Sequence, residues 1–97
     1  MEKITKEILQ FRDERGWKPF HDPKDLAISI SLEANELLEI FQWKSSEEAK
    51  ANSMQNIKEE MADVLIYLIQ MADQLDIDLE REVLSKLLKN AQKYPVK

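Results

Sequence analysis

The chain has 97 residues, of which 43% are apolar, and it carries one glycine, three prolines and a formal net charge of −5. This length fits a single domain over residues 1–97, and the shortage of glycine and proline favours helices over a sheet with tight hairpins. The lack of cysteine excludes disulfides, thiolate zinc sites and a cysteine nucleophile, and it fits a cytoplasmic location. The negative charge argues against binding to a nucleic acid polymer, and no apolar run reaches the roughly 20 residues that cross a membrane.

The first two helices of a predicted all-α fold are delimited by their capping residues. One helix is expected from about Ile4 to Arg15, and Gly16 suits its C-terminal cap. After a connector, Asp22 offers a capping side chain, and the proline that follows it has a backbone dihedral suited to a first helical turn. We therefore expect the second helix from about Pro23 to Trp43.

The second half of the chain predicts two further helices and a short helical segment. These are a segment capped by Ser45 or Ser46 and ending near Asn52, a helix from about Met54 to Leu75, and a last helix capped by Asp78 and ending near Tyr94 and Pro95. The third long helix is apolar on nearly every face from Val64 to Met71, a pattern typical of a helix that is buried all round. Four helices of this size offer too little surface to cover it, so we expect an oligomer whose interface includes the second and third helices. A monomer with one central helix is the alternative.

Two pairs of carboxylates lie on the second and third helices. Glu33 and Glu36 are three residues apart in LEANELLEIF, and Glu60 and Asp63 repeat that spacing at the start of EEMADVLIYLIQMA. Residues three apart project from the same face of a helix. Antiparallel packing of the two helices can therefore bring four acidic groups to one point.

No basic side chain accompanies these acids, because lysine and arginine are absent from residues 25–43 and 59–80. A buried unpaired charge is costly, so the acids either face water or hold cations, and ligand sets made only of oxygen suit Mg²⁺, with Mn²⁺ as a substitute. A di-iron bundle would be expected to carry Glu-x-x-His pairs, and the one histidine, His21, lies outside both pairs. The alternative from another class is an acidic helical dimerisation or interaction module, without catalysis, whose carboxylates are solvated.

The two acidic motifs, EANE at 33–36 and EMAD at 60–63, resemble the E-x-x-E…E-x-x-D pattern of the MazG-like nucleotide pyrophosphohydrolases. The blocks FHDPKDLAISISLEANELLEIFQWK, EEMADVLIYLIQMA and KLLKNAQKYP are similar to the dCTP pyrophosphatase branch, so the resemblance covers about Phe11 to Pro95. It implies a four-helix MazG-like bundle assembled as a dimer or a dimer of dimers. It also implies Mg²⁺-dependent hydrolysis of a nucleoside triphosphate to a monophosphate and pyrophosphate, as nucleotide-pool house-cleaning.

The resemblance also implies roles for individual residues. The metal ligands would be Glu33, Glu36, Glu60 and Asp63, and Glu36 and Glu39 would act in catalysis, Glu39 by binding a metal or orienting water. Residues suited to contact the substrate are Trp17, His21, Trp43, Tyr67, Lys86, Asn90 and Lys93. Core packing for the tryptophans, a turn contact for His21 and solvation for the lysines are the alternative roles. Ile8 stands where the dCTP-preferring branch would place a base-contacting histidine, so the sequence does not assign the base.

Overall fold

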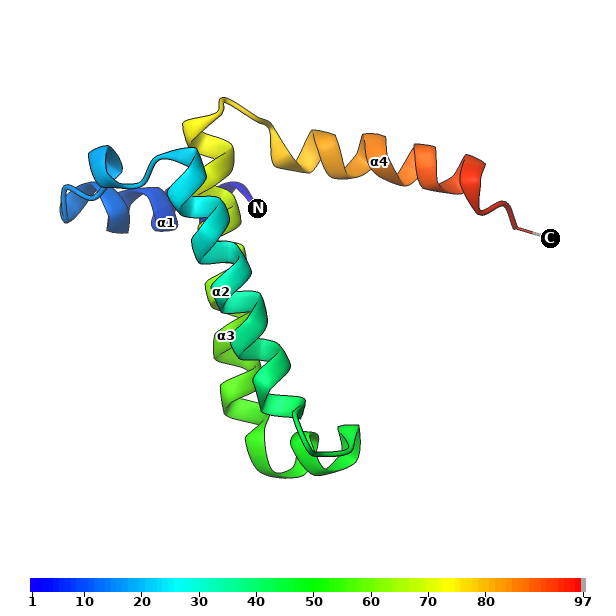
Figure 1. Cartoon of the computed structure of the whole chain (residues 1–97). Helices are drawn as coiled ribbons and strands as arrows, with labels where there is room; N and C mark the ends of the chain where they lie inside the picture. Colours follow the sequence, from blue (N-terminus) through cyan, green and yellow to red (C-terminus); the bar gives the residue numbers. More distant parts are fainter. Residues whose placement is uncertain (97) are drawn as a thin grey trace.

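The computed structural model describes residues 1–96, which form helices and connecting loops without any β-strand (Figure 1). The elements in chain order are α1 (Glu2–Glu14), the 3₁₀ turn η1 (Lys18–Phe20), α2 (Pro23–Phe41), α3 (Ser46–Gln74) and α4 (Leu79–Lys93). The predicted all-α fold is confirmed. No helix within these 96 residues has both the length and the apolar character needed to cross a membrane.

Capping side chains start three of the helices. The carboxylate of Asp22 accepts a hydrogen bond of 2.8 Å from the backbone N–H of Asp25, at the start of α2. Ser45 and Asp78 accept in the same way from the residue three positions later, each at 3.1 Å. Gly16 follows α1 with a φ of 64°, a left-handed conformation that costs glycine little. Local chemistry therefore accounts for the starts of these three helices and for the end of α1, whereas α2 ends at Phe41, before the predicted end at Trp43.

A kink at Ser53 divides α3 into the two parts that the sequence predicts. Ser53 has φ −132° and ψ 21°, which are not helical values, although hydrogen bonding continues through it. The short part before the kink is anchored by Ala49, which is completely buried. The long part carries the second acidic motif.

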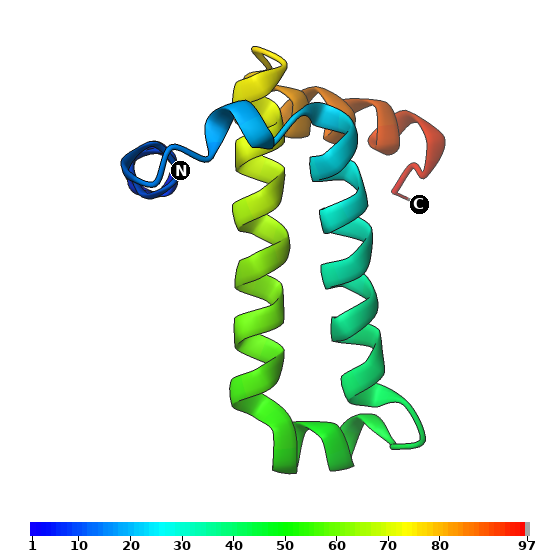
Figure 2. The ribbon, with the colours of Figure 1, turned by 60° about the vertical axis from the view of Figure 1, so that its left-hand side comes forward.

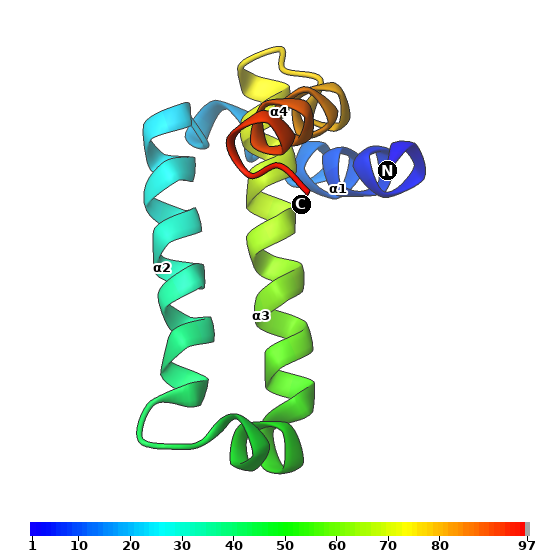
Figure 3. The same cartoon turned by 90° about the vertical axis from the view of Figure 1, so that its right-hand side faces the viewer.

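Helices α2 and α3 pack as an antiparallel hairpin, while α1 crosses α3 near its C-terminal end (Figure 2, Figure 3). Helix α4 extends away from this hairpin and buries none of its residues (Figure 1). A single chain therefore contributes four helices, arranged as a two-helix hairpin with two outlying helices, and the bundle assembled from two or more copies stays a prediction.

The apolar run of α3 is only partly covered within one chain. Ile69 and Ala72 are buried, with 3% and 9% of their surface exposed, but residues 64–68 are half-buried. The prediction of a helix buried on every side is thus not met by the single chain, in which α2 and the crossing α1 provide most of the packing against α3. Met61, which precedes the run, remains 59% exposed.

A buried ion pair fixes α1 to the C-terminal end of α3. Arg12 is 2% exposed, and its Nη1 donates to Oδ2 of Asp73 at 2.7 Å while its Nε donates to Asp13 at 2.9 Å. Burial alone would lower the pKa of Arg12, but the hydrogen bonds to the two aspartates outweigh it and raise the pKa. Nearby, the side chain of Gln74 donates to the backbone carbonyl of Lys18 at 3.0 Å. These contacts hold the connector between α1 and α2 against α3.

Candidate metal and nucleotide site

Three carboxylates meet between α2 and α3. Glu33 and Glu36 of α2 and Glu60 of α3 each offer an oxygen, and these oxygens all lie within 4.8 Å of one another. The spacing of three residues puts Glu33 and Glu36 on one face of α2, and the antiparallel hairpin brings Glu60 opposite them. The structure thus joins three of the four predicted metal ligands. We call Glu33, Glu36 and Glu60 the carboxylate triad.

The carboxylate triad is electrostatically unbalanced. Burial raises the pKa of Glu33 to about 7, helped by the side chains of Glu60 and Glu36 and by the charges of Glu36 and Asp63. Burial is also the leading cause that raises the pKa of Glu60. Within residues 1–96, the Oε2 atoms of Glu33 and Glu60 are buried and have no hydrogen-bond partner. Buried acceptors without a donor are costly, so this arrangement fits a cation among the carboxylates.

Asp63, the fourth predicted ligand, lies beside the triad rather than within it. It is half-buried on α3, three residues after Glu60, and its charge raises the pKa of Glu33. Burial also raises the pKa of Tyr67, with further contributions from the charges of Glu33, Asp63 and Glu36. Asp63 and Tyr67 therefore connect the triad with the space above it.

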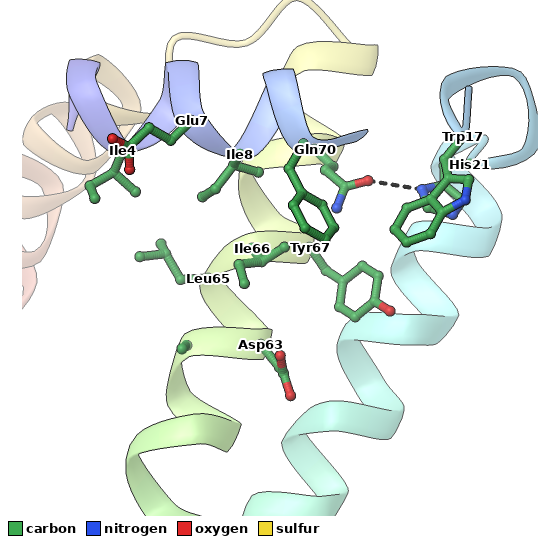
Figure 4. Close-up of a pocket in the computed structure, with 12 residues that line it drawn as sticks. Ile4, Glu7, Ile8, Trp17, His21, Asp63, Leu65, Ile66, Tyr67 and Gln70 are labelled. Atoms are coloured by element: carbon green, nitrogen blue, oxygen red, sulfur yellow. Dashed lines mark hydrogen bonds between the residues drawn. The ribbon is translucent and has the colours of Figure 1, made fainter. Parts of the chain in front are cut away.

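That space is a pocket of about 640 Å³ between α1, the connector and α3 (Figure 4). Its lining is mostly apolar: Ile4, Glu7, Ile8, Phe11, Trp17, His21, Ala62, Asp63, Leu65, Ile66, Tyr67 and Gln70. The ring of Trp17 lies 5.8 Å from that of Phe11 in an edge-to-face arrangement and 5.7 Å from the imidazole of His21. The predicted residues Trp17, His21 and Tyr67 thus share one cavity whose lower edge is Asp63.

The other predicted residues lie outside this pocket in the single chain. Trp43 follows the C-terminal end of α2 and is 93% exposed, whereas the pocket lies near the N-terminal end of that helix. Glu39 is exposed and accepts a hydrogen bond of 3.1 Å from Asn35. The three α4 residues, Lys86, Asn90 and Lys93, are on the helix that points away from the hairpin (Figure 1).

Gln70 is a pocket residue that the sequence reasoning did not select. It is 4% exposed, and its Oε1 lies 2.8 Å from Nδ1 of His21. The available signal was a single amide within the apolar run VLIYLIQMA, because a polar side chain in a buried run needs a partner. The partner comes from the connector 49 residues earlier, which no local pattern reveals.

Comparison with known proteins places these features in a family. A sequence model described as the MazG-like family matches residues 28–97. The dCTP pyrophosphatase 1 of Rattus norvegicus is 41% identical over 101 residues, covering 99% of this chain and 59% of that protein. The Homo sapiens dCTP pyrophosphatase 1 is 37% identical over 100 residues, covering 98% of this chain and again 59% of the relative. The chain therefore spans about three fifths of the length of these curated relatives.

A solved structure has the same fold over nearly the whole chain. The crystal structure of a pyrophosphatase from Archaeoglobus fulgidus superimposes with a TM-score of 0.91 at 46% sequence identity. The match covers 99% of this chain and 93% of the archaeal one. Sequence, fold and paired acidic helices agree, and the chain belongs to the MazG-like family.

Proposed function

We propose that this protein is a Mg²⁺-dependent nucleoside triphosphate pyrophosphohydrolase, which releases a nucleoside monophosphate and pyrophosphate and removes unwanted nucleotides from the pool. The observation that carries the proposal is the carboxylate triad, with three oxygens within 4.8 Å and two buried oxygens that lack a partner within the described chain. The names of the similar proteins, dCTP pyrophosphatase 1 and an archaeal pyrophosphatase, support the same reaction class.

The donor set fits a hard divalent cation. Glu33, Glu36 and Glu60 would hold it, with Asp63 as a further carboxylate at the edge, and such oxygen ligands suit Mg²⁺ or Mn²⁺. When bound, the cation neutralises the charge of the phosphates and acts as a Lewis acid toward their oxygens. The histidine that an iron site would require is instead bonded to Gln70 in the pocket.

The chain's own residues then orient the reactants. Glu36 is the exposed member of the triad, so its carboxylate is accessible to a water molecule and can accept its proton. The water oxygen forms a bond to the α-phosphorus, and the bond from that phosphorus to the bridging oxygen breaks, which releases pyrophosphate. We assign Glu39, one turn further along α2 and also exposed, an assisting role in metal binding or water orientation.

The pocket above Asp63 suits the nucleoside. Trp17 and Phe11 offer aromatic walls, and base stacking on such rings is worth roughly 1–3 kcal/mol per base. The hydroxyl of Tyr67 lies between this pocket and the triad, where it can contact sugar or phosphate oxygens. A nucleotide would thus place its phosphates near the carboxylates and its base among the aromatic rings.

We further propose that the active form is a dimer or a dimer of dimers. Helix α4 leaves a stripe of apolar residues exposed, namely Val83, Leu84, Leu87 and Leu88. Trp43 is 93% exposed and has a φ of 63°, and an exposed tryptophan in this strained conformation favours a contact made only on assembly or substrate binding. Lys86, Asn90, Lys93 and Trp43 would then reach a site through a second copy.

A nucleotide panel tests this function. The protein is incubated with each ribo- and deoxyribonucleoside triphosphate with and without Mg²⁺, and the products are resolved by chromatography. We expect monophosphate plus pyrophosphate, dependence on the metal, and a loss of about 100-fold or more in kcat for Glu36→Gln. Glu59→Gln is the matched control, because Glu59 is exposed on α3 and lies outside the triad. Release of diphosphate plus phosphate, or no turnover at all, contradicts the proposal.

A further inference from the structure

The pocket holds one buried amide in an otherwise apolar stretch of α3. Gln70 is 4% exposed, and its neighbours along the helix are Ile69 and Met71. Burying a polar side chain costs free energy unless its donors and acceptors find partners. An apolar residue would cover this part of the pocket at lower cost, so the amide calls for a specific explanation.

A hydrogen bond to His21 fixes the orientation of this amide. The Oε1 of Gln70 faces Nδ1 of His21 at 2.8 Å, and because a carbonyl oxygen only accepts, the imidazole carries a proton on Nδ1 and donates it. The amide nitrogen must then point to the other side. Figure 4 shows that nitrogen turned away from His21, toward the part of the pocket that holds Tyr67.

The amide nitrogen is available to a ligand. Among residues 1–96, Nε2 of Gln70 takes part in no hydrogen bond, and it is absent from the atoms that the protein seals off completely. Gln70 lines the pocket, so this donor reaches the cavity. Because this atom is not sealed off, water can satisfy the donor in the free protein, and a ligand acceptor would take the place of that water.

The position of Gln70 suits contact with a base. It follows Asp63 by seven residues, so both project from nearly the same face of α3 and are separated by about 10 Å along the helix axis. Asp63 lies next to the carboxylate triad, and Trp17 lines the same pocket as Gln70. A nucleotide whose phosphates lie at the acids has room for its ribose between these points, and its base edge then meets the amide.

We propose that Gln70 is a specificity-determining residue whose amide N–H donates to a carbonyl oxygen of the nucleobase, and that His21 is the positioning residue that fixes the amide. The substrate class is nucleoside triphosphates whose base carries a carbonyl oxygen. This inference rests on the proposed function. An adenine amino group facing Gln70 would place two donors against each other, and a site built around a hydrogen bond discriminates strongly against a ligand that cannot complete it.

The first test removes the donor. Gln70→Met keeps the length of the side chain, and KM and kcat are measured for cytosine, uracil, guanine and adenine nucleoside triphosphates and for ribose 5′-triphosphate, which has no base. For the carbonyl-bearing nucleotides we expect KM to rise about 10-fold or more, with kcat within about threefold of the unsubstituted protein. The KM for ribose 5′-triphosphate stays unchanged, and the KM for the adenine nucleotide stays unchanged or falls, because the clash between two donors is removed.

The control and the contrary outcomes separate base contact from general damage. Gln55→Met makes the same change at an exposed position of α3 and should alter no constant. An equal rise in KM for ribose 5′-triphosphate or the adenine nucleotide, or no rise for the carbonyl-bearing nucleotides, overturns the assignment. If Gln70→Met does not fold, Gln70→Glu replaces it, because the carboxylate still accepts from His21 but offers no donor to the base.

The second test concerns His21. In His21→Asn the side-chain amide can still donate to Oε1 of Gln70, whereas in His21→Leu nothing can. The ratio of kcat/KM for the preferred carbonyl-bearing nucleotide over the adenine nucleotide should fall about 10-fold in His21→Leu and recover most of its value in His21→Asn. Equal ratios in the two variants would show that His21 only fills space.

Failure of the proposed function remains distinguishable from failure of this inference. If the unsubstituted protein hydrolyses no nucleotide with Mg²⁺ or Mn²⁺, the proposed function is wrong. Calorimetric titration with cytidine, uridine, guanosine and adenosine monophosphates then tests Gln70 independently. A preference for the three carbonyl-bearing monophosphates that Gln70→Met abolishes supports the inference, and an equal response to all four overturns it.

Discussion

At the scale of single residues, the structure contains one buried charge that is paired with opposite charges and two partly buried carboxylates that are not. Arg12 is buried, and two carboxylates hydrogen-bond its guanidinium. Glu33 and Glu60 each have a buried oxygen without a partner among residues 1–96, and their nearest charged neighbours are other acids. The first arrangement stabilises the fold by itself, whereas the second is unfavourable until a bound proton or the proposed cation neutralises it.

The pKa of Glu33 makes the stability of the metal-free protein depend on pH. Its pKa rises from 4.5 to about 7 in the folded state, so the folded protein binds this proton more tightly than the unfolded chain. The resulting stabilisation is complete below pH 4.5 and is lost as the pH rises through about 7. We therefore expect the Tm in chelator-treated buffer to fall between about pH 5 and pH 8 in the unsubstituted protein, and to fall less in Glu33→Gln.

Thermal melts across this range, recorded for both proteins by circular dichroism, provide the measurement. The difference between the two curves isolates Glu33 from other titrating groups. Added Mg²⁺ should stabilise the unsubstituted protein more at high pH, because deprotonated carboxylates bind metal better. Parallel Tm curves for the two proteins would contradict the assigned titration.

Asp63→Asn should separate activity from stability. We expect kcat to fall about 100-fold or more because a carboxylate of the proposed metal site is lost. The Tm in metal-free buffer should stay the same or rise, since one negative charge near Glu33 and Glu60 is removed. Asp76→Asn, at an exposed position outside the pocket, serves as the control. Turnover close to that of the unsubstituted protein, in a folded variant, would remove Asp63 from the metal site.

At the scale of secondary-structure elements, the crossing of α1 over α3 builds the pocket. The pair Arg12–Asp73 and the bond from Gln74 to the connector fix this crossing. The connector carries Trp17 and His21, so their approach to Tyr67 of α3 depends on these contacts. A weaker crossing should therefore affect both stability and substrate binding.

Arg12→Met should lower the free energy of unfolding by about 2–4 kcal/mol, because it removes two charge-assisted hydrogen bonds and leaves Asp73 without its main partner. Lys50→Ala removes an exposed pair with Glu47 at 3.8 Å and should cost less than about 1 kcal/mol. Urea unfolding of both variants measures the difference. Similar losses in the two variants would mean that the buried pair does not hold α1 in place.

At the scale of the whole molecule, much apolar surface remains uncovered. Leu84 and Leu88 of α4 are 60% and 72% exposed, and Leu32 and Leu38 of α2 are 58% and 65% exposed. Soluble monomers rarely expose large contiguous apolar patches, and such patches typically mark an interface. This exposure supports the proposed assembly, in which a second copy would cover α4 and the hairpin.

Leu88→Glu tests the assembly without disturbing the chain's own core. We expect light scattering to give at least a dimer for the unsubstituted protein at micromolar concentration and a monomer for Leu88→Glu, with helix content retained. Lys89→Glu introduces an acid at the neighbouring exposed position and should stay assembled. Ile69 is unsuitable for this purpose, since it is 3% exposed within one chain and an acid there would unfold it. A monomeric, fully active unsubstituted protein would contradict the proposal.

The sequence alone determined the helices and the likeness of the two acidic motifs to a known family. Helix boundaries follow from contacts between residues three or four positions apart, as in the cap of Asp22, and the spacing of Glu33 and Glu36 sets their common face by the same local geometry. The sequence likewise predicts a short segment that ends near Asn52 and a helix from about Met54, and the kink lies between them at Ser53.

The tertiary structure decided which of these residues meet. The sequence sets how far Trp43 lies from Glu33 and Glu36 along α2, but it does not show at which end of that helix the pocket forms. The crossing of α1 places the pocket at the end of α2 opposite Trp43. Gln70 became a candidate only through His21, 49 positions earlier. Which distant residues meet is determined by the way whole helix faces pack against one another. This packing produces no periodic pattern in the sequence around the residues that come into contact.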